Sequence, residues 1–184
     1  MPHFRGFIAI DIEPFTKIVD FVNEIKKSGA SVKIVELKNI HITLKFLGNT
    51  DEDLIEKIEN IIKDSLENIE PFEIELKGAG VFPNMNYMKV IWIGIEPVDL
   101  LGSIAKRIDE QLSKLGFEKE KRKFSAHLTI ARIKSAKNKE KLKQILEKYQ
   151  EVNFGKINIE SIKLKKSDLT PKGPIYTTLK DVKI

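Results

Sequence analysis

The sequence predicts a two-lobed α+β fold in which a unit of strands and helices occurs twice. Short apolar runs alternate along the chain with segments whose apolar residues follow helical spacing. A four-residue pattern begins at His41 and again at His127, 86 positions later. It consists of a histidine, an apolar residue, a threonine and a second apolar residue. The 184 residues suffice for one domain or for two small lobes that share a core.

The first half of the chain predicts four strands and two helices. In order, these are a strand over 4–12, a helix over 15–28, strands over 32–36 and 39–48, a helix over 51–66 and a strand over 72–76. Pro14 and Gly29 mark the ends of the first strand and the first helix. Acidic residues in the first turn favour a helix start near Asp51.

The second half repeats this order. The pattern predicts a strand over 87–95, a helix over 100–115, a strand over 124–133, a helix over 142–149, one long alternating strand over 152–164 and a last strand over 175–184. The turn-rich segment 78–84 is the candidate boundary between the halves. We therefore expect a single domain over 1–184, made of two similar lobes of about 1–84 and 85–184 that pack as one rigid body.

Composition excludes several classes of protein. With no cysteine, the chain cannot form a disulfide, a thiolate nucleophile, a zinc ribbon or an iron–sulfur cluster. Hydrophobic residues make up 41% of the chain, which argues against disorder. No apolar run reaches the ~18 residues of a spanning helix and no signal-peptide pattern is present, so we expect a cytoplasmic protein without a membrane partner. The net charge of +5 permits an anionic partner without requiring one.

The two repeated tetrapeptides contain the candidate catalytic residues. Because residues i and i+2 of a strand share a face, His41 and Thr43 project together, as do His127 and Thr129. One imidazole can accept a proton from water while the other donates one to a leaving oxygen, and the threonine hydroxyls can donate to phosphoryl oxygens. This set suits attack on a phosphodiester without a metal, above all on a strained cyclic one.

Two other interpretations of the histidines remain open. A histidine in a strand can be a hydrogen-bonded structural residue, and two histidines can ligate zinc. A catalytic zinc site usually has a third protein ligand, and no His-Glu-x-x-His or similar pattern occurs here. Two matches at equivalent places in a duplication favour catalysis.

The paired motifs resemble those of the 2H phosphoesterase superfamily. The second motif, which continues as His-Leu-Thr-Ile-Ala-Arg to Arg132, and the flanking segments are most similar to the RNA 2′,3′-cyclic phosphodiesterase branch, historically called 2′-5′ RNA ligases. The similar segments are 5–11, 39–48, 80–83, 90–94 and 166–176, so the resemblance covers nearly the whole chain. The sequence departs from the family at Ala126, where a proline is common.

The resemblance implies a fold and a reaction. The fold has two antiparallel sheets that face a central cleft, with helices packed outside. The reaction is hydrolysis of RNA ends or nucleotides bearing a 2′,3′-cyclic phosphate to 2′-phosphomonoesters, without metal or cofactor, by a protein expected to be a monomer. We expect His127 to activate water and His41 to protonate the leaving O3′. End-joining of tRNA halves through a 2′-5′ linkage and a non-catalytic RNA-end binding module are the alternatives.

Five further residues are candidates for substrate binding, namely Thr43, Thr129, Arg132, Lys45 and Phe7. Thr43 and Thr129 carry over from the motifs, and Arg132 matches a basic residue of the family. Simple strand parity places Arg132 on the face opposite His127, so it reaches the cleft only through a bulge or a strand end; otherwise it is a surface arginine. Lys45 shares the facing direction of His41 and could reach a phosphate, or could be an exposed strand lysine.

Several side chains could either contact substrate or have a purely structural role. Phe7 could stack on a terminal base or pack in the core, whereas Phe46 lies on the buried parity and is expected in the core. Tyr176 could contact substrate or simply pack. The basic run 121–123 could lead RNA toward the cleft or solvate a loop.

Overall fold

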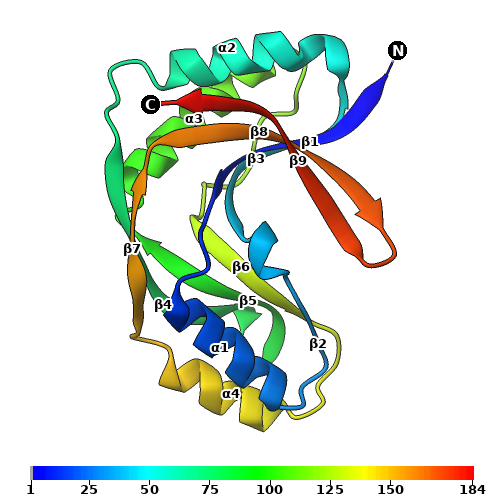
Figure 1. The fold of residues 1–184 in the computed structure, drawn as a ribbon, viewed down its shortest axis with the longest axis vertical. Helices are drawn as coiled ribbons and strands as arrows, with labels where there is room; N and C mark the ends of the chain where they lie inside the picture. The colour runs from blue at the N-terminus through cyan, green and yellow to red at the C-terminus, as the bar shows by residue number, and fades with distance from the viewer. Residues whose placement is uncertain (1) are drawn as a thin grey trace.

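Two antiparallel sheets form the centre of the molecule (Figure 1). The computed structural model describes residues 2–184. In the four-stranded sheet the order is β3 (His41–Asp51), β1 (His3–Asp11), β8 (Ser161–Thr170) and β9 (Gly173–Lys183). In the five-stranded sheet it is β2 (Val32–Ile34), β6 (His127–Ile133), β5 (Tyr87–Glu96), β4 (Phe72–Asn84) and β7 (Asn153–Ile159). The α+β fold with two antiparallel sheets is confirmed.

The helices pack in two pairs, one pair for each sheet. They are α1 (Thr16–Lys27), α2 (Ile55–Ser65), α3 (Asp99–Ser113) and α4 (Lys139–Lys148), with short 3-10 turns η1 (Leu37–Asn39) and η2 (Glu52–Leu54). Figure 1 shows α2 and α3 together beside the four-stranded sheet, and α1 and α4 together at the far end, beside the five-stranded sheet. Each helix turns an apolar stripe inward; in α2, Ile58 and Ile62 are fully buried.

The two sheets do not correspond to the two halves of the sequence. The expected boundary near residue 84 falls between β4 and β5, which pair as a hairpin with Asn84 opposite Tyr87. Residues 78–84 are the last part of β4, and the Asn84 side chain accepts hydrogen bonds from the backbone N–H groups of Asn86 and Tyr87, so the segment leads into a hairpin turn instead of a linker. Each sheet contains strands from both halves, because β1 and β3 join β8 and β9, while β2 and β4 join β5, β6 and β7.

The expected long strand over 152–164 is two strands in different sheets. β7 ends at Ile159 in the five-stranded sheet, and β8 begins at Ser161 in the four-stranded sheet. Glu160 alone connects them, and its carbonyl accepts a hydrogen bond from the N–H of Ile184. The prediction of one strand is wrong because period-2 alternation continues through the crossing and carries no information about which sheet a strand joins. Within residues 2–184, no helix has the length and apolar character needed to cross a membrane.

Candidate active site

The first histidine–threonine pair lies on β3, an edge strand of the four-stranded sheet. His41 Nδ1 is 2.7 Å from the carbonyl oxygen of Asn39 and Nε2 is 3.0 Å from Thr43 Oγ1. Because a carbonyl only accepts, Nδ1 carries the proton in the neutral ring, and Nε2 presents its lone pair toward the threonine hydroxyl. Ile42 and Leu44 are buried on the other side of the strand. The predicted parity of this pair is confirmed.

The second pair lies on β6 and is held in the same way. His127 Nδ1 is 3.0 Å from the carbonyl oxygen of Ser125, again two residues before the histidine. Leu128 and Ile130 are buried on the opposite side, while His127 and Thr129 are partly exposed. Both motifs therefore fix Nδ1 of the imidazole on a backbone carbonyl, and in His41 the other ring nitrogen, Nε2, lies against the Thr43 hydroxyl.

A β-bulge follows the threonine in the first motif. On β1, alternating residues Phe7, Ala9 and Asp11 share a face, and their partners on β3 are Phe46, Thr43 and His41. Leu44 and Lys45 therefore both lie on the core side of the strand, as consecutive residues do across a bulge. After the bulge, Phe46 returns to the face of His41 and is 66% exposed.

The second motif contains a bulge at the equivalent place. Thr129 pairs with Trp92, but Ala131 pairs with Ile91, so Ile130 is the additional residue. Arg132 then pairs with Val90 and shares the face of His127, where its side chain is exposed. The bulge that Arg132 needs to reach this face is present.

The structure corrects the expectations for Lys45 and Phe46. Lys45 lies behind the strand, with its side chain 3% exposed, and its Nζ donates to Asp109 Oδ1 at 2.7 Å, to the Glu118 carbonyl at 2.7 Å and to Glu120 Oε1 at 3.1 Å. All three donors are engaged, so this ammonium is not available to a phosphate. Phe46 is exposed and not part of the core, since the bulge reverses its parity.

Phe7 packs in the core, which is the second of the two roles considered for it from the sequence. It is 3% exposed and packs with ring centroids 5.1 Å from His41 and 4.9 Å from Tyr176. A ring covered in this way supports His41 and has no free face for a base. Tyr176 also meets His41 edge-on at 5.4 Å, so it contacts the site directly.

Aromatic residues also surround His127, and sequence reasoning missed them. Phe82 meets His127 edge-on at 5.3 Å and lies 5.1 Å from Trp92. Trp92 covers Gly80 so closely that a Cβ atom there would lie 2.3 Å from the indole. Both aromatic residues fall in segments on which the family resemblance rests, 80–83 and 90–94. That resemblance was the signal in the sequence that could have placed them near the site. Each histidine thus lies against an aromatic cluster of its own sheet.

Burial, together with nearby charges, sets the proton affinity of His41. Burial lowers the pKa of His41, the Lys165 ammonium acts in the same direction, and the hydrogen bond to Asn39 opposes both. Lys165 donates to Asp11 at 2.6 Å and Lys163 donates to it at 2.9 Å. Burial raises the pKa of Asp11, but these two bonds outweigh burial, so the carboxylate stays charged.

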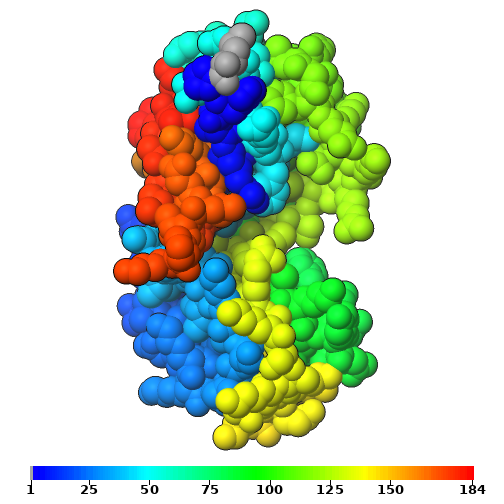
Figure 2. Space-filling model, turned by 90° about the vertical axis from the view of Figure 1, so that its right-hand side faces the viewer, coloured from blue at the N-terminus to red at the C-terminus, as the bar shows by residue number. Residues whose placement is uncertain are grey.

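The strands that carry the two motifs lie close to each other. β3 and β6 are in contact across the space between the sheets. Burial raises the pKa of Tyr176 in the four-stranded sheet, while the charges of Arg132, from the other sheet, and Arg5 act to lower it. Figure 2 shows the surface hollowed at mid-height, between the lime segment near residues 110–122 above and the green segment near 80–90 below. The hollow lies between the part of the molecule built on the four-stranded sheet, which contains β3, and the part built on the five-stranded sheet, which contains β6.

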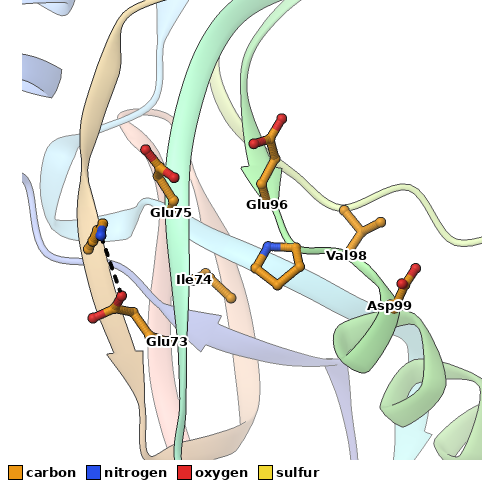
Figure 3. Close-up of a pocket in the computed structure, with 8 residues that line it drawn as sticks. Glu73, Ile74, Glu75, Glu96, Val98 and Asp99 are labelled. Atoms are coloured by element: carbon orange, nitrogen blue, oxygen red, sulfur yellow. Dashed lines mark ion pairs between the residues drawn. The ribbon is translucent and has the colours of Figure 1, made fainter.

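A cavity at the far ends of β4 and β5 has the wrong charge for a phosphate. It measures about 540 Å³ and is lined by Glu73, Glu75, Glu96 and Asp99, with Lys156 as its one basic residue (Figure 3). Within residues 2–184, no three histidine, aspartate or glutamate side chains gather as a set of metal ligands.

Residues 7–184 match the sequence model of the AKAP7 2'5' RNA ligase-like domain. The chain belongs to this family. A Methanocaldococcus jannaschii protein named RNA 2',3'-cyclic phosphodiesterase is 49% identical over 179 residues, which cover 96% of this chain and 99% of the relative. A Methanothermobacter thermautotrophicus protein of the same name is 40% identical over 179 residues, 95% of this chain and 96% of the relative.

Solved structures share the fold over its whole length. The protein TT0787 of Thermus thermophilus superposes with a TM-score of 0.80 at 25% identity and covers 97% of each chain. Escherichia coli LigT complexed with 3'-AMP gives a TM-score of 0.73 at 20% identity, covering 100% of this chain and 99% of its own, which shows likeness of fold alone. The family predicted from the paired motifs is confirmed.

Proposed function

We propose that the protein is an RNA 2′,3′-cyclic phosphodiesterase that opens the cyclic phosphate at an RNA end to a 2′-phosphomonoester. The observation that carries this proposal is the pair of histidine–threonine dyads, each with Nδ1 held by the carbonyl two residues earlier, on strands that meet between the sheets. The names of the relatives at 40% and 49% identity support it.

The reaction needs two proton transfers, one for each histidine. Water attacks phosphorus as one imidazole removes its proton, and the bond from phosphorus to O3′ breaks as the other imidazolium protonates that oxygen. The hydroxyls of Thr43 and Thr129 donate to the phosphoryl oxygens, where negative charge builds up. We keep the sequence-based roles, with His127 as base and His41 as acid. The anionic phosphate raises the pKa of a nearby histidine, so substrate binding favours the protonated form that His41 needs.

The buried position of His41 predicts a pH dependence. Because burial lowers the pKa of His41 below its ordinary value of 6.5, we expect the alkaline limb of the kcat/KM profile, along which this general acid loses its proton, to have its midpoint below pH 6.5. Replacing Lys165 with methionine removes a positive charge beside the ring and should move that limb toward higher pH. The measurement is kcat/KM for adenosine 2′,3′-cyclic phosphate between about pH 4.5 and 9. A limb at or above 6.5 in the wild-type protein would contradict the prediction.

The two bulges suggest how the base is bound. Phe46 and Arg132 are equivalent residues, each three positions after the motif threonine, and each projects from the face of its histidine. Both have an exposed flat group, and bases stack on phenyl rings and on guanidinium planes. We propose that they hold the terminal base between them.

Substitution of these two residues tests the base contact. Stacking contributes roughly 1–3 kcal/mol per base, so we expect Phe46→Ala and Arg132→Ala each to raise KM about tenfold, with a smaller change in kcat. Arg132→Lys keeps the charge and loses the flat group, so it should resemble Arg132→Ala if stacking dominates. Unchanged KM in both alanine variants would place the base elsewhere.

The decisive experiment is incubation with adenosine 2′,3′-cyclic phosphate, with and without EDTA, followed by identification of the product. We expect the 2′-monophosphate at the same rate in both conditions. A reaction with an RNA 5′-hydroxyl acceptor separates end-joining from hydrolysis, because only end-joining gives a 2′-5′ product. Tight RNA binding without turnover would favour a binding module and defeat the proposal. Monomeric state and cytoplasmic location stay predictions from the sequence.

A further inference from the structure

We infer that the protein holds the RNA chain upstream of the cyclic end in a basic groove between the outer edge of β3 and the segment 117–122. This inference rests on the proposed function and extends it. It assigns the enzyme to single-stranded RNA ends in preference to free cyclic nucleotides.

The groove is continuous with the active-site face. It measures about 440 Å³ and is lined by residues 45–48 of β3 on one side and residues 117–122 on the other. Phe46 belongs both to this groove and to the face that carries His41 and Thr43. A nucleotide stacked on Phe46 therefore has its next neighbour at the entrance to the groove. Figure 2 shows the lime segment standing out beside the hollow at mid-height.

The walls of the groove suit a chain of phosphates. Lys119, Lys121 and Arg122 line it and are exposed. The two carboxylates nearby compensate them only in part, because Glu120 pairs with Lys45, and the pair between Lys121 and Glu118 is 3.6 Å long and more than 80% exposed on both sides. Exposed basic side chains along a groove are the usual means of binding a single strand without sequence preference.

The segment that forms the outer wall is fixed in place. The buried Lys45 ammonium joins β3 to the Glu118 carbonyl, to Glu120 and to Asp109 on α3. Asp109 also accepts a hydrogen bond from the N–H of Glu120 at 3.2 Å. An otherwise irregular segment is thus tied to the strand that carries His41. A binding wall ordered before the ligand arrives costs less conformational entropy on binding.

Charge disfavours a path for the RNA chain along the face of His127 toward Glu75 and Glu96. On the face of His127, Glu75 and Glu96 are direct partners on adjacent strands, and Figure 3 shows both carboxylates on the same side of the sheet. Like charges placed directly opposite each other destabilise a sheet, and here they also repel phosphates. An RNA chain that leaves the site toward residues 117–122 avoids this repulsion.

The test compares a mononucleotide with an oligonucleotide that has the same end. The substrates are adenosine 2′,3′-cyclic phosphate and a single-stranded decanucleotide ending in adenosine 2′,3′-cyclic phosphate. In the Lys121→Ala/Arg122→Ala variant we expect KM for the decanucleotide to rise about tenfold at low salt and KM for the mononucleotide to stay unchanged. The slope of log KM against log salt should fall by about 1.4, because two phosphate contacts are lost. The matched control is Lys26→Ala/Lys27→Ala, which removes two exposed charges at the end of α1.

The affinity for the labelled decanucleotide is measured by fluorescence anisotropy. This measurement distinguishes an error in the proposed RNA-binding groove from an error in the proposed phosphodiesterase function. Equal affinity of the wild type and the groove variant, or an equal loss in the α1 control, overturns the groove. Weaker binding by the groove variant alone supports it. If the wild type turns over neither substrate and the groove variant still binds more weakly, only the phosphodiesterase proposal is overturned.

Discussion

Replacement of either His41 or His127 by alanine should lower kcat for adenosine 2′,3′-cyclic phosphate by about 10²–10⁴-fold. Each histidine is expected to carry one of the two proton transfers, and the other ring cannot serve both ends of an in-line displacement at once. The double variant that lacks both histidines should lower kcat by much less than the product of the two single fold-decreases, because the rings act as a unit. The measurement is kcat under saturating substrate, with circular dichroism to confirm that each variant is folded.

Two controls separate loss of chemistry from loss of structure. His41 packs against Phe7 and Tyr176, so the His41→Gln variant, which keeps more of the side-chain volume, shows whether an empty space causes the effect. His3→Ala changes the remaining histidine, which is exposed at the start of β1, and should leave kcat unchanged. Activity within a few-fold of wild type in a folded His127→Ala variant would exclude the two-histidine mechanism.

The sequence predicted how each histidine–threonine pair faces on its strand because that geometry is local. A histidine and a threonine two positions apart share a face in any strand, and the alternating apolar residues of each motif must then face the core. Nothing beyond the motif is needed for this inference. The repeat at His127 added the information that one strand alone could not supply, since a second acid–base group was expected in an equivalent environment.

The positions just after each motif could not be derived in the same way. Parity holds only while a strand stays regular, and a single extra residue reverses it. The bulges after Thr43 and Thr129 move Lys45 and Ala131 into the interior and bring Phe46 and Arg132 to the active face. Apolar alternation alone gave no sign of either bulge. The need for one was visible only for Arg132, because the family resemblance placed it in the site.

The two bulged strands also show how equivalent positions have diverged. On β6 the buried residue after the bulge is Ala131, which needs no partner, and on β3 it is Lys45, which needs three. The difference matches their surroundings, because β6 lies between two strands whereas β3 is an edge strand with the segment 117–122 beside it. A buried lysine at an edge can hold an irregular segment against the sheet, which an alanine cannot do.

Substitution of Lys45 therefore tests a structural role against the phosphate contact expected from the sequence. Loss of one partner from a buried ion pair costs about 3–5 kcal/mol, and we expect Lys45→Ala to fall near the lower end of that range because Glu120 is 55% exposed and regains water. The free energy of unfolding, measured by urea titration, gives this cost. KM for adenosine 2′,3′-cyclic phosphate should not change in the fraction that stays folded.

The pH dependence and two control variants sharpen the same test. Burial lowers the pKa of Lys45, but its bonds to Asp109 and Glu120 outweigh burial and raise the pKa above 10.5, so its contribution is fully present at neutral pH and is lost only as pH rises through that raised value. One control is Lys183→Ala, which removes the ion pair between Lys183 and Asp181. The Lys183 side chain is 74% exposed, so this change should alter the unfolding free energy by less than about 1 kcal/mol. Lys45→Met combined with Asp109→Leu should recover part of the loss, since it leaves no unpaired charge on α3. A stable Lys45→Ala variant with a strongly raised KM for the mononucleotide would instead assign Lys45 to the phosphate. It would also require the segment 117–122 to be held in place by other contacts.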